Sequence, residues 1–99
     1  MIALVSTFEG VTEAGSKLFH TGGEFIRKNY PEVRAQWWRP MSGKFGPSFI
    51  IWWHASLAAK EAFDAKFFAD PRWQKIFKDA GPGPLWTSQR DDYYNVVES

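Results

Sequence analysis

The sequence predicts an α+β domain in which a four-stranded antiparallel sheet carries its helices on one face, in the ferredoxin-like order βαββαβ. Three observations lead to this prediction. Residues 49–53 form an aromatic and β-branched run that is typical of a buried strand. At Ser56, a preferred helix N-cap, this run passes into the strong helix formers of residues 57–62. The segments before and after this pair have strand and helix character in the order that the motif requires.

The first half of the chain supplies one strand, one helix and a second strand. Residues 2–9 are rich in β-formers, and Gly10 closes this strand. Helical spacing of apolar residues follows over about 12–30, and it ends there because Pro31 disfavours helical conformation in the residue before it. Residues 33–39 then have the composition of a strand.

Glycines inside the first predicted helix leave two interpretations open. Gly15 and Gly22 fall on the same side of the helix as its apolar residues, where each costs about 0.5–1 kcal/mol relative to alanine. A continuous helix explains them by a close approach to the sheet. The alternative is that Thr21-Gly22-Gly23 breaks the helix in two.

The second half completes the motif. Asp70 and Pro71 mark a helix start, because aspartate is a preferred N-cap and proline is favoured at the first helical position. The glycines and prolines of residues 81–84 end this helix. In chain order, the remaining segments are a Gly/Pro-marked connection (40–47), a strand (48–54), a helix (56 to about 69) and a last strand (about 85–97).

The aromatic content predicts a homodimer. A chain of 99 residues is a single domain, and 18% of its residues are aromatic. Strand 48–54 is apolar on both faces, with Ile50 and Trp52 on one side and Phe49, Ile51 and Trp53 on the other. The helices cover only one face of the sheet. Two sheets packed face to face about a two-fold axis would cover the other.

Charge and cysteine content exclude several classes of function. The 12 basic and 11 acidic residues are scattered, so nucleic acid is not an expected partner. The absence of cysteine excludes thiolate metal sites, and two histidines without metal-ligand spacing predict no metal site. No stretch approaches a membrane span, and the first nine residues lack the basic start of a signal peptide, so we expect a cytoplasmic protein.

Residues 48–80 resemble the dimeric α/β-barrel superfamily, and within it the NIPSNAP-like domains. The resemblance rests on Trp52-Trp53-His54-Ala55-Ser56-Leu57-Ala58-Ala59, on Glu61-Ala62-Phe63 and on Ala69-Asp70-Pro71-Arg72-Trp73. It implies a ferredoxin-like fold that dimerises into a barrel. The superfamily contains cofactor-independent oxygenases, polyketide cyclases, haem-degrading enzymes and domains without known activity. The resemblance therefore implies the fold and leaves the function open.

Three residues are candidates for catalysis. His54 would be a general base near neutral pH if it faces the interior with Trp52; otherwise it is a histidine at a strand end, satisfied by backbone or solvent. Arg39, at a strand end, would be the cationic partner of an anionic or enolate ligand. Tyr94 would donate its hydroxyl to a substrate carbonyl, since Tyr93 and Tyr94 point to opposite faces and only one can enter a cavity.

Ligand contacts are predicted at Trp38, Trp52, Trp86 and Arg90. The three tryptophans would line a cavity for a planar apolar molecule, and the alternative places them in the core and the dimer interface. Arg90 would bind an anionic group, or it would form a cross-strand ion pair. No cofactor is predicted; a haem needs an axial ligand such as histidine, and either histidine could serve singly.

The sequence thus predicts a homodimeric NIPSNAP-like domain that binds a small apolar or aromatic molecule in a barrel cavity. The alternative is a cofactor-independent monooxygenase or polyketide-type cyclase with His54 as general base. These two functions differ in whether His54, an arginine and a tyrosine converge on one open pocket.

Overall fold

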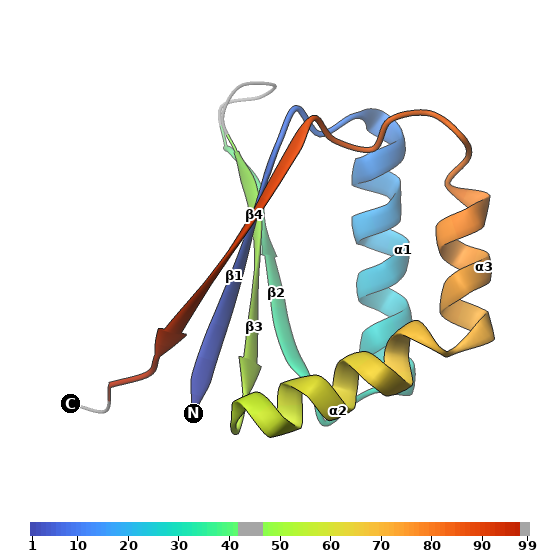
Figure 1. Ribbon diagram of the computed structural model, residues 1–99. Coiled ribbons are helices and arrows are strands. Elements are labelled where there is room, and N and C mark those ends of the chain that lie inside the picture. The colour runs from blue at the N-terminus through green and yellow to red at the C-terminus, as the bar shows by residue number, and fades with distance from the viewer. Residues whose placement is uncertain (42–46, 98–99) are drawn as a thin grey trace.

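The computed structural model describes residues 1–41 and 47–97 and contains the elements in the predicted order (Figure 1). Residues 42–46, the middle of the predicted connection, lie outside the described residues. The last strand begins at Ser88, three residues later than predicted. The elements are β1 (Ile2–Glu9), α1 (Glu13–Asn29), β2 (Arg34–Trp38), β3 (Ser48–His54), α2 (Leu57–Phe68), α3 (Pro71–Asp79) and β4 (Ser88–Asn95).

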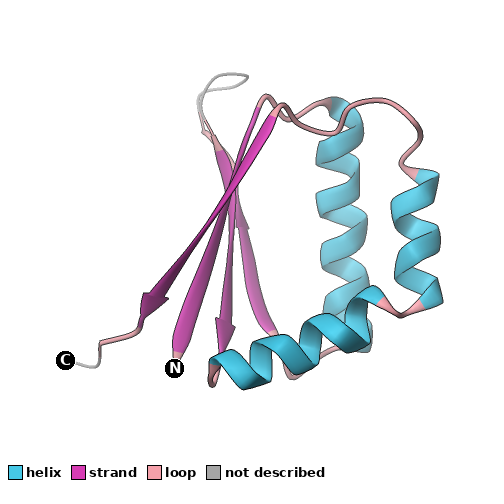
Figure 2. Cartoon of the chain, in the orientation of Figure 1, coloured by secondary structure: helices cyan, strands magenta, loops and turns pink. Residues whose placement is uncertain are grey.

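The four strands form one antiparallel sheet in the order β2-β3-β1-β4, which confirms the ferredoxin-like prediction. All three helices lie on the same side of this sheet, and α2 crosses beside its lower end (Figure 2). Among the described residues, no helix is both long enough and apolar enough to cross a membrane.

Helix α1 is continuous, so the alternative of a break at Gly22-Gly23 is wrong. Its N-cap is Thr12, whose side chain accepts a hydrogen bond from the Gly15 amide at 3.1 Å. A Cβ on Gly15 would collide with the carbonyl oxygen of Leu85, and one on Gly22 would lie 3.0 Å from the Trp73 ring. These glycines therefore allow a close approach to the loop before β4 and to α3. The predicted approach to the sheet is not the reason for them.

The register of the strands assigns each side chain of β3 to a face of the sheet. Trp52 is paired with Leu4, which is buried under the helices, so Ile50 and Trp52 face the helices as predicted. Phe49, Ile51 and Trp53 point to the opposite side, which we call the open face. In full, the open face contains Ala3, Val5, Thr7, Arg34, Gln36, Trp38, Phe49, Ile51, Trp53, Arg90, Asp92 and Tyr94.

Aromatic rings fill the space between the sheet and the helices in two clusters. The lower cluster surrounds the buried residues Ile26, Tyr30 and Phe67. The upper cluster consists of Phe8, Phe19, Trp37 and Trp86, with ring centroids 4.7–5.6 Å apart. Most of the aromatic residues on the helix side therefore belong to the core.

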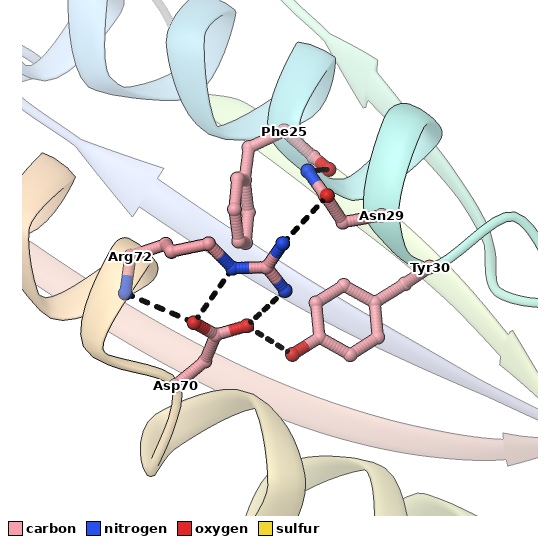
Figure 3. Close-up of polar contacts among 5 residues, drawn as sticks. All are labelled: Phe25, Asn29, Tyr30, Asp70 and Arg72. Carbon is pink, nitrogen blue, oxygen red and sulfur yellow. Dashed lines mark hydrogen bonds and ion pairs between the residues drawn. The ribbon is translucent and has the colours of Figure 1, made fainter.

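A polar clamp joins the end of α1 to the start of α3 (Figure 3). The Tyr30 hydroxyl is buried and donates to Asp70 Oδ2 at 2.7 Å. Asp70 caps α3 by accepting from the Arg72 amide at 2.9 Å, and the Arg72 guanidinium donates to both carboxylate oxygens at 3.1 and 2.8 Å. The same guanidinium donates to Asn29 Oδ1 at 2.9 Å. The hydrogen bonds from Arg72 and then Tyr30 hold the pKa of Asp70 well below its ordinary value.

Removing the clamp should destabilise the fold. We expect Asp70→Ala to lower the Tm by more than about 5 °C, because it removes a helix cap and leaves a buried hydroxyl without its acceptor. Asp79→Ala on the same helix is the control, since its carboxylate is exposed and forms only a surface pair with Lys75. Thermal unfolding followed by circular dichroism measures both.

The same pair of proteins tests the charge of Asp70. A carboxylate whose pKa is lowered by folding stabilises the protein above its unfolded value of about 3.9, and this stabilisation is lost as the pH falls below that value. The difference in Tm between wild type and Asp70→Ala should therefore shrink between about pH 5 and pH 2. A difference that does not change over this range would show that the ionised carboxylate is not what stabilises the clamp.

Candidate functional site

His54 occupies the corner where β3 ends and α2 begins. The alternation of β3 places its imidazole on the helix side, and the register pairs the residue with Ile2 at the end of the sheet. The chain turns at once, because the Ser56 side chain accepts a hydrogen bond from the Ala59 amide at 3.1 Å and starts α2. Since only two residues separate the end of β3 from the start of α2, the helix must cross close to His54.

Burial determines the protonation state of His54. The residue is only 7% exposed, and its ring lies 5.7 Å from that of Phe63 on α2. Desolvation lowers the pKa of His54 below 6.5, the carboxylate of Asp64 opposes this shift, and the ammonium of Lys60 adds to it. The imidazole is therefore neutral at pH 7 and offers one donor nitrogen and one acceptor nitrogen.

A pocket of about 350 Å3 opens beside His54, between one flank of α2 and the ends of β2 and β3. Three alanines and Phe63 make most of this pocket apolar, and Glu32 and Lys66 bring one charge of each sign. Its volume lies near the lower limit for small-molecule sites. The pocket is lined by Glu32, Val33, Trp53, His54, Ala55, Ala59, Ala62, Phe63 and Lys66.

The opposite flank of α2 brings polar side chains toward β4. Lys60 forms an ion pair with Asp64, and its ammonium lies 5.7 Å from the centre of the Tyr93 ring. Hydrogen bonding to Asp64 and then to Tyr93 raises the pKa of Lys60. The sequence interpretation missed this group and chose Tyr94 over Tyr93. Tyr93 is paired with the buried Leu4, so Tyr93 faces the helices and Tyr94 faces the open side of the sheet. No sequence pattern fixes this register of β4.

The structure places the three predicted catalytic residues in three different regions. His54 lies on the pocket. Arg39 follows β2 at the opposite end of the sheet, with its guanidinium 5.9 Å from the Trp37 ring. Tyr94 is on the open face and 55% exposed. Arg39 and Tyr94 do not line the pocket that contains His54.

The predicted ligand contacts are also dispersed. Trp52 packs against Phe63 in the lower cluster, and Trp86 stacks on Phe19 in the upper one. Trp38 is half-exposed on the open face, stacked on Phe49. Arg90 is on the same face, and it donates to Asp92 of its own strand at 2.8 Å, where the sequence interpretation considered a cross-strand pair.

A second hollow, of about 790 Å3, lies between α1 and α3 and is lined by residues such as Leu18 and Ile76. The hollow between α1 and α3 is lined by none of the predicted site residues. Within residues 1–41 and 47–97, no three His, Asp or Glu side chains form a group that could hold a metal ion.

Solved structures of other proteins share the fold of this chain, but its sequence matches no family model and no curated protein. The structure matches an uncharacterised NIPSNAP domain protein from Burkholderia xenovorans with a TM-score of 0.75 and 19% identity, over 98% of this chain and 95% of that one. The chain has the NIPSNAP fold. This confirms the resemblance at the level of the fold.

Two other solved structures with this fold come from proteins with named activities. One is a candidate antibiotic biosynthesis monooxygenase from Caulobacter crescentus, with a TM-score of 0.70 and 18% identity over 98% of this chain and 90% of that one. The other is the haem degrader MhuD from Mycobacterium tuberculosis with two haems in its active site, with a TM-score of 0.63 and 19% identity over 100% and 98% of the two chains. At these identities the likeness concerns the fold alone.

The buried imidazole should make stability depend on pH. The unfolded chain takes up a proton on His54 near pH 6.5 more readily than the folded one, so folding becomes less favourable as the pH falls below that value. We expect the Tm to fall between pH 7.5 and pH 5.5, and this fall should be smaller in His54→Gln. His20→Gln is the control, because His20 is exposed on α1. An equal fall of the Tm in wild type and His54→Gln would show that His54 is not the source of the pH dependence.

Proposed function

We propose that this chain is a homodimeric domain that binds a small apolar or aromatic molecule in the pocket beside His54. The observation that supports it best is the pocket itself, where a neutral, buried imidazole faces a mostly apolar hollow of about 350 Å3. Sites for small molecules commonly combine an apolar lining with a few polar groups that fix orientation. His54 can supply a hydrogen bond without requiring a charged ligand.

The proposed dimer forms through the open face of the sheet. Phe49, Ile51 and Trp53 run down its centre, and no helix among the described residues covers them (Figure 2). Trp38 and Tyr94 extend this surface on the two edge strands and are 50% and 55% exposed. A two-fold axis would bring two such faces together, so that each copy provides the apolar layer that the other lacks.

The charged residues of the open face are compatible with burial in such an interface. Arg34 places its guanidinium 4.4 Å from the centre of the Trp53 ring. Arg90 is neutralised by Asp92 on its own strand. Cationic groups that stack on aromatic rings or pair with carboxylates lose less on desolvation than isolated charges do.

A second candidate function is catalysis without a cofactor, with His54 as general base. The neutral imidazole on the pocket supports it, because a base must be unprotonated to accept a proton. A solved structure with this fold comes from a candidate antibiotic biosynthesis monooxygenase, and this likeness of fold is consistent with the second function. Lys66 lines the pocket and would orient an anionic substrate in place of Arg39.

Dimerisation is tested by placing a charge at the centre of the open face. Ile51→Lys should convert the dimer to a monomer, because two ammonium groups would be buried opposite each other across the two-fold axis. Ala65→Lys, on the exposed side of α2, should remain dimeric. Sedimentation velocity at tens of micromolar distinguishes these outcomes. A monomeric wild-type protein would overturn the dimer proposal.

Ligand binding is tested with 2-naphthol, a planar apolar probe with one hydroxyl. Ala62→Leu should weaken its binding about tenfold or more, since the added atoms would occupy the pocket. Ala58→Leu is the matched control, because Ala58 is exposed on the same helix and does not line the pocket. Isothermal titration calorimetry measures both. Equal affinities of Ala62→Leu and Ala58→Leu for 2-naphthol would show that the probe binds outside this pocket.

A further inference from the structure

Haem is the ligand that a solved structure with this fold contains, and binding it makes two demands on a protein. The protein must supply an axial ligand to the iron, usually histidine, cysteine, methionine or tyrosine. It must also provide a hollow large enough for a tetrapyrrole. In the described part of this chain, these two requirements are met in different places.

The larger hollow has no axial ligand. Its volume is about 790 Å3, and its lining consists of threonine, alanine, leucine, isoleucine, proline and charged side chains from α1, α3 and the loop before β4. None of these is a histidine, methionine or tyrosine. The sequence contains no cysteine.

The two histidines lie where a haem does not fit. His54 lines the smaller pocket, whose 350 Å3 is near the lower limit for small-molecule sites. His20 is on the solvent side of α1, where its ring is 71% exposed and lies 3.2 Å from the Glu24 carboxylate. A haem on His20 would lie on the protein surface with its apolar ring in water.

The space between the sheet and the helices offers no alternative. The rings of Phe19 and Trp86 are stacked there, with centroids 5.6 Å apart and an angle of 10°. Phe8 packs on both rings at 4.9 and 4.7 Å, and Trp37 packs on Phe19 at 5.3 Å. A flat macrocycle would have to displace this closely packed cluster from the core.

We infer that this chain selects a compact aromatic ligand of one or two rings, bound by a hydrogen bond to His54, and does not coordinate haem. This inference rests on the function proposed above and names its ligand class. The ligand is uncharged overall, because Glu32 and Lys66 give the lining of the pocket one charge of each sign. It carries a hydroxyl, an amide or a ring nitrogen that pairs with the imidazole.

The experiment compares hemin with 2-naphthol on the His20→Gln variant, in which His54 is the only histidine. Hemin is followed by its Soret absorbance, and 2-naphthol by the NMR resonances of the His54 ring. We expect 2-naphthol to shift those resonances in a saturable way, and hemin to give no saturable Soret change. His54→Ala reports whether any hemin bound depends on the imidazole.

The possible results separate the inference from the proposed function. Stoichiometric hemin binding would overturn the inference. If that binding is lost in His54→Ala, the pocket beside His54 still stands as a ligand site, and if it persists, hemin binds elsewhere on the chain. A His54 resonance that responds to neither compound would overturn both. Selective response to 2-naphthol supports both and fixes the size class of the ligand.

Discussion

The position of the candidate site depends on the buried hydrogen bond between Tyr30 and Asp70. Tyr30 ends α1, and Asp70 lies in the short break between α2 and α3. This bond therefore fixes the far end of α2 against the body of the protein, while Ser56 fixes its near end directly after β3. Because both of its ends are fixed, α2 must run across the end of the sheet. The pocket beside His54 is the space that remains between α2 and the strand ends when the helix lies in this position.

The two faces of β3 have different physical roles. On the helix side, Trp52 contacts Phe63 and belongs to a packed core. On the other side, Phe49, Ile51 and Trp53 pack against neighbouring strands but have no layer above them in a single chain. A strand that is apolar on both faces is normally buried on both. The unequal covering of one strand is thus the structural basis for the proposed dimer, and Trp53, which also lines the pocket at the strand end, connects the two features.

The local parts of the fold were predictable from sequence because short-range chemistry determines them. Ser56 and Asp70 act as N-caps, as their residue types indicate, and Pro71 begins α3. The alternation of residues in β3 gave the correct faces. Which of the predicted residues lie near one another was not predictable, because this depends on the register of the strands and on the placement of the helices. Arg39 and His54 are both at strand ends, but antiparallel pairing sends them to opposite ends of the sheet. The choice between Tyr93 and Tyr94 likewise depended on which residue of β4 faces Leu4.

The abundance of aromatic residues explains why a small-molecule site is expected at a corner of this molecule. In this chain of 99 residues, 18% of which are aromatic, stacked rings occupy both clusters between the sheet and the helices. The two hollows found among the described residues lie where elements end or diverge, and the one at the end of β3 also holds the buried imidazole of His54. In the proposed site, the packed core aromatics would limit the size of the ligand, and α2, with its alanines at positions 59 and 62, would form one wall of the place where it binds.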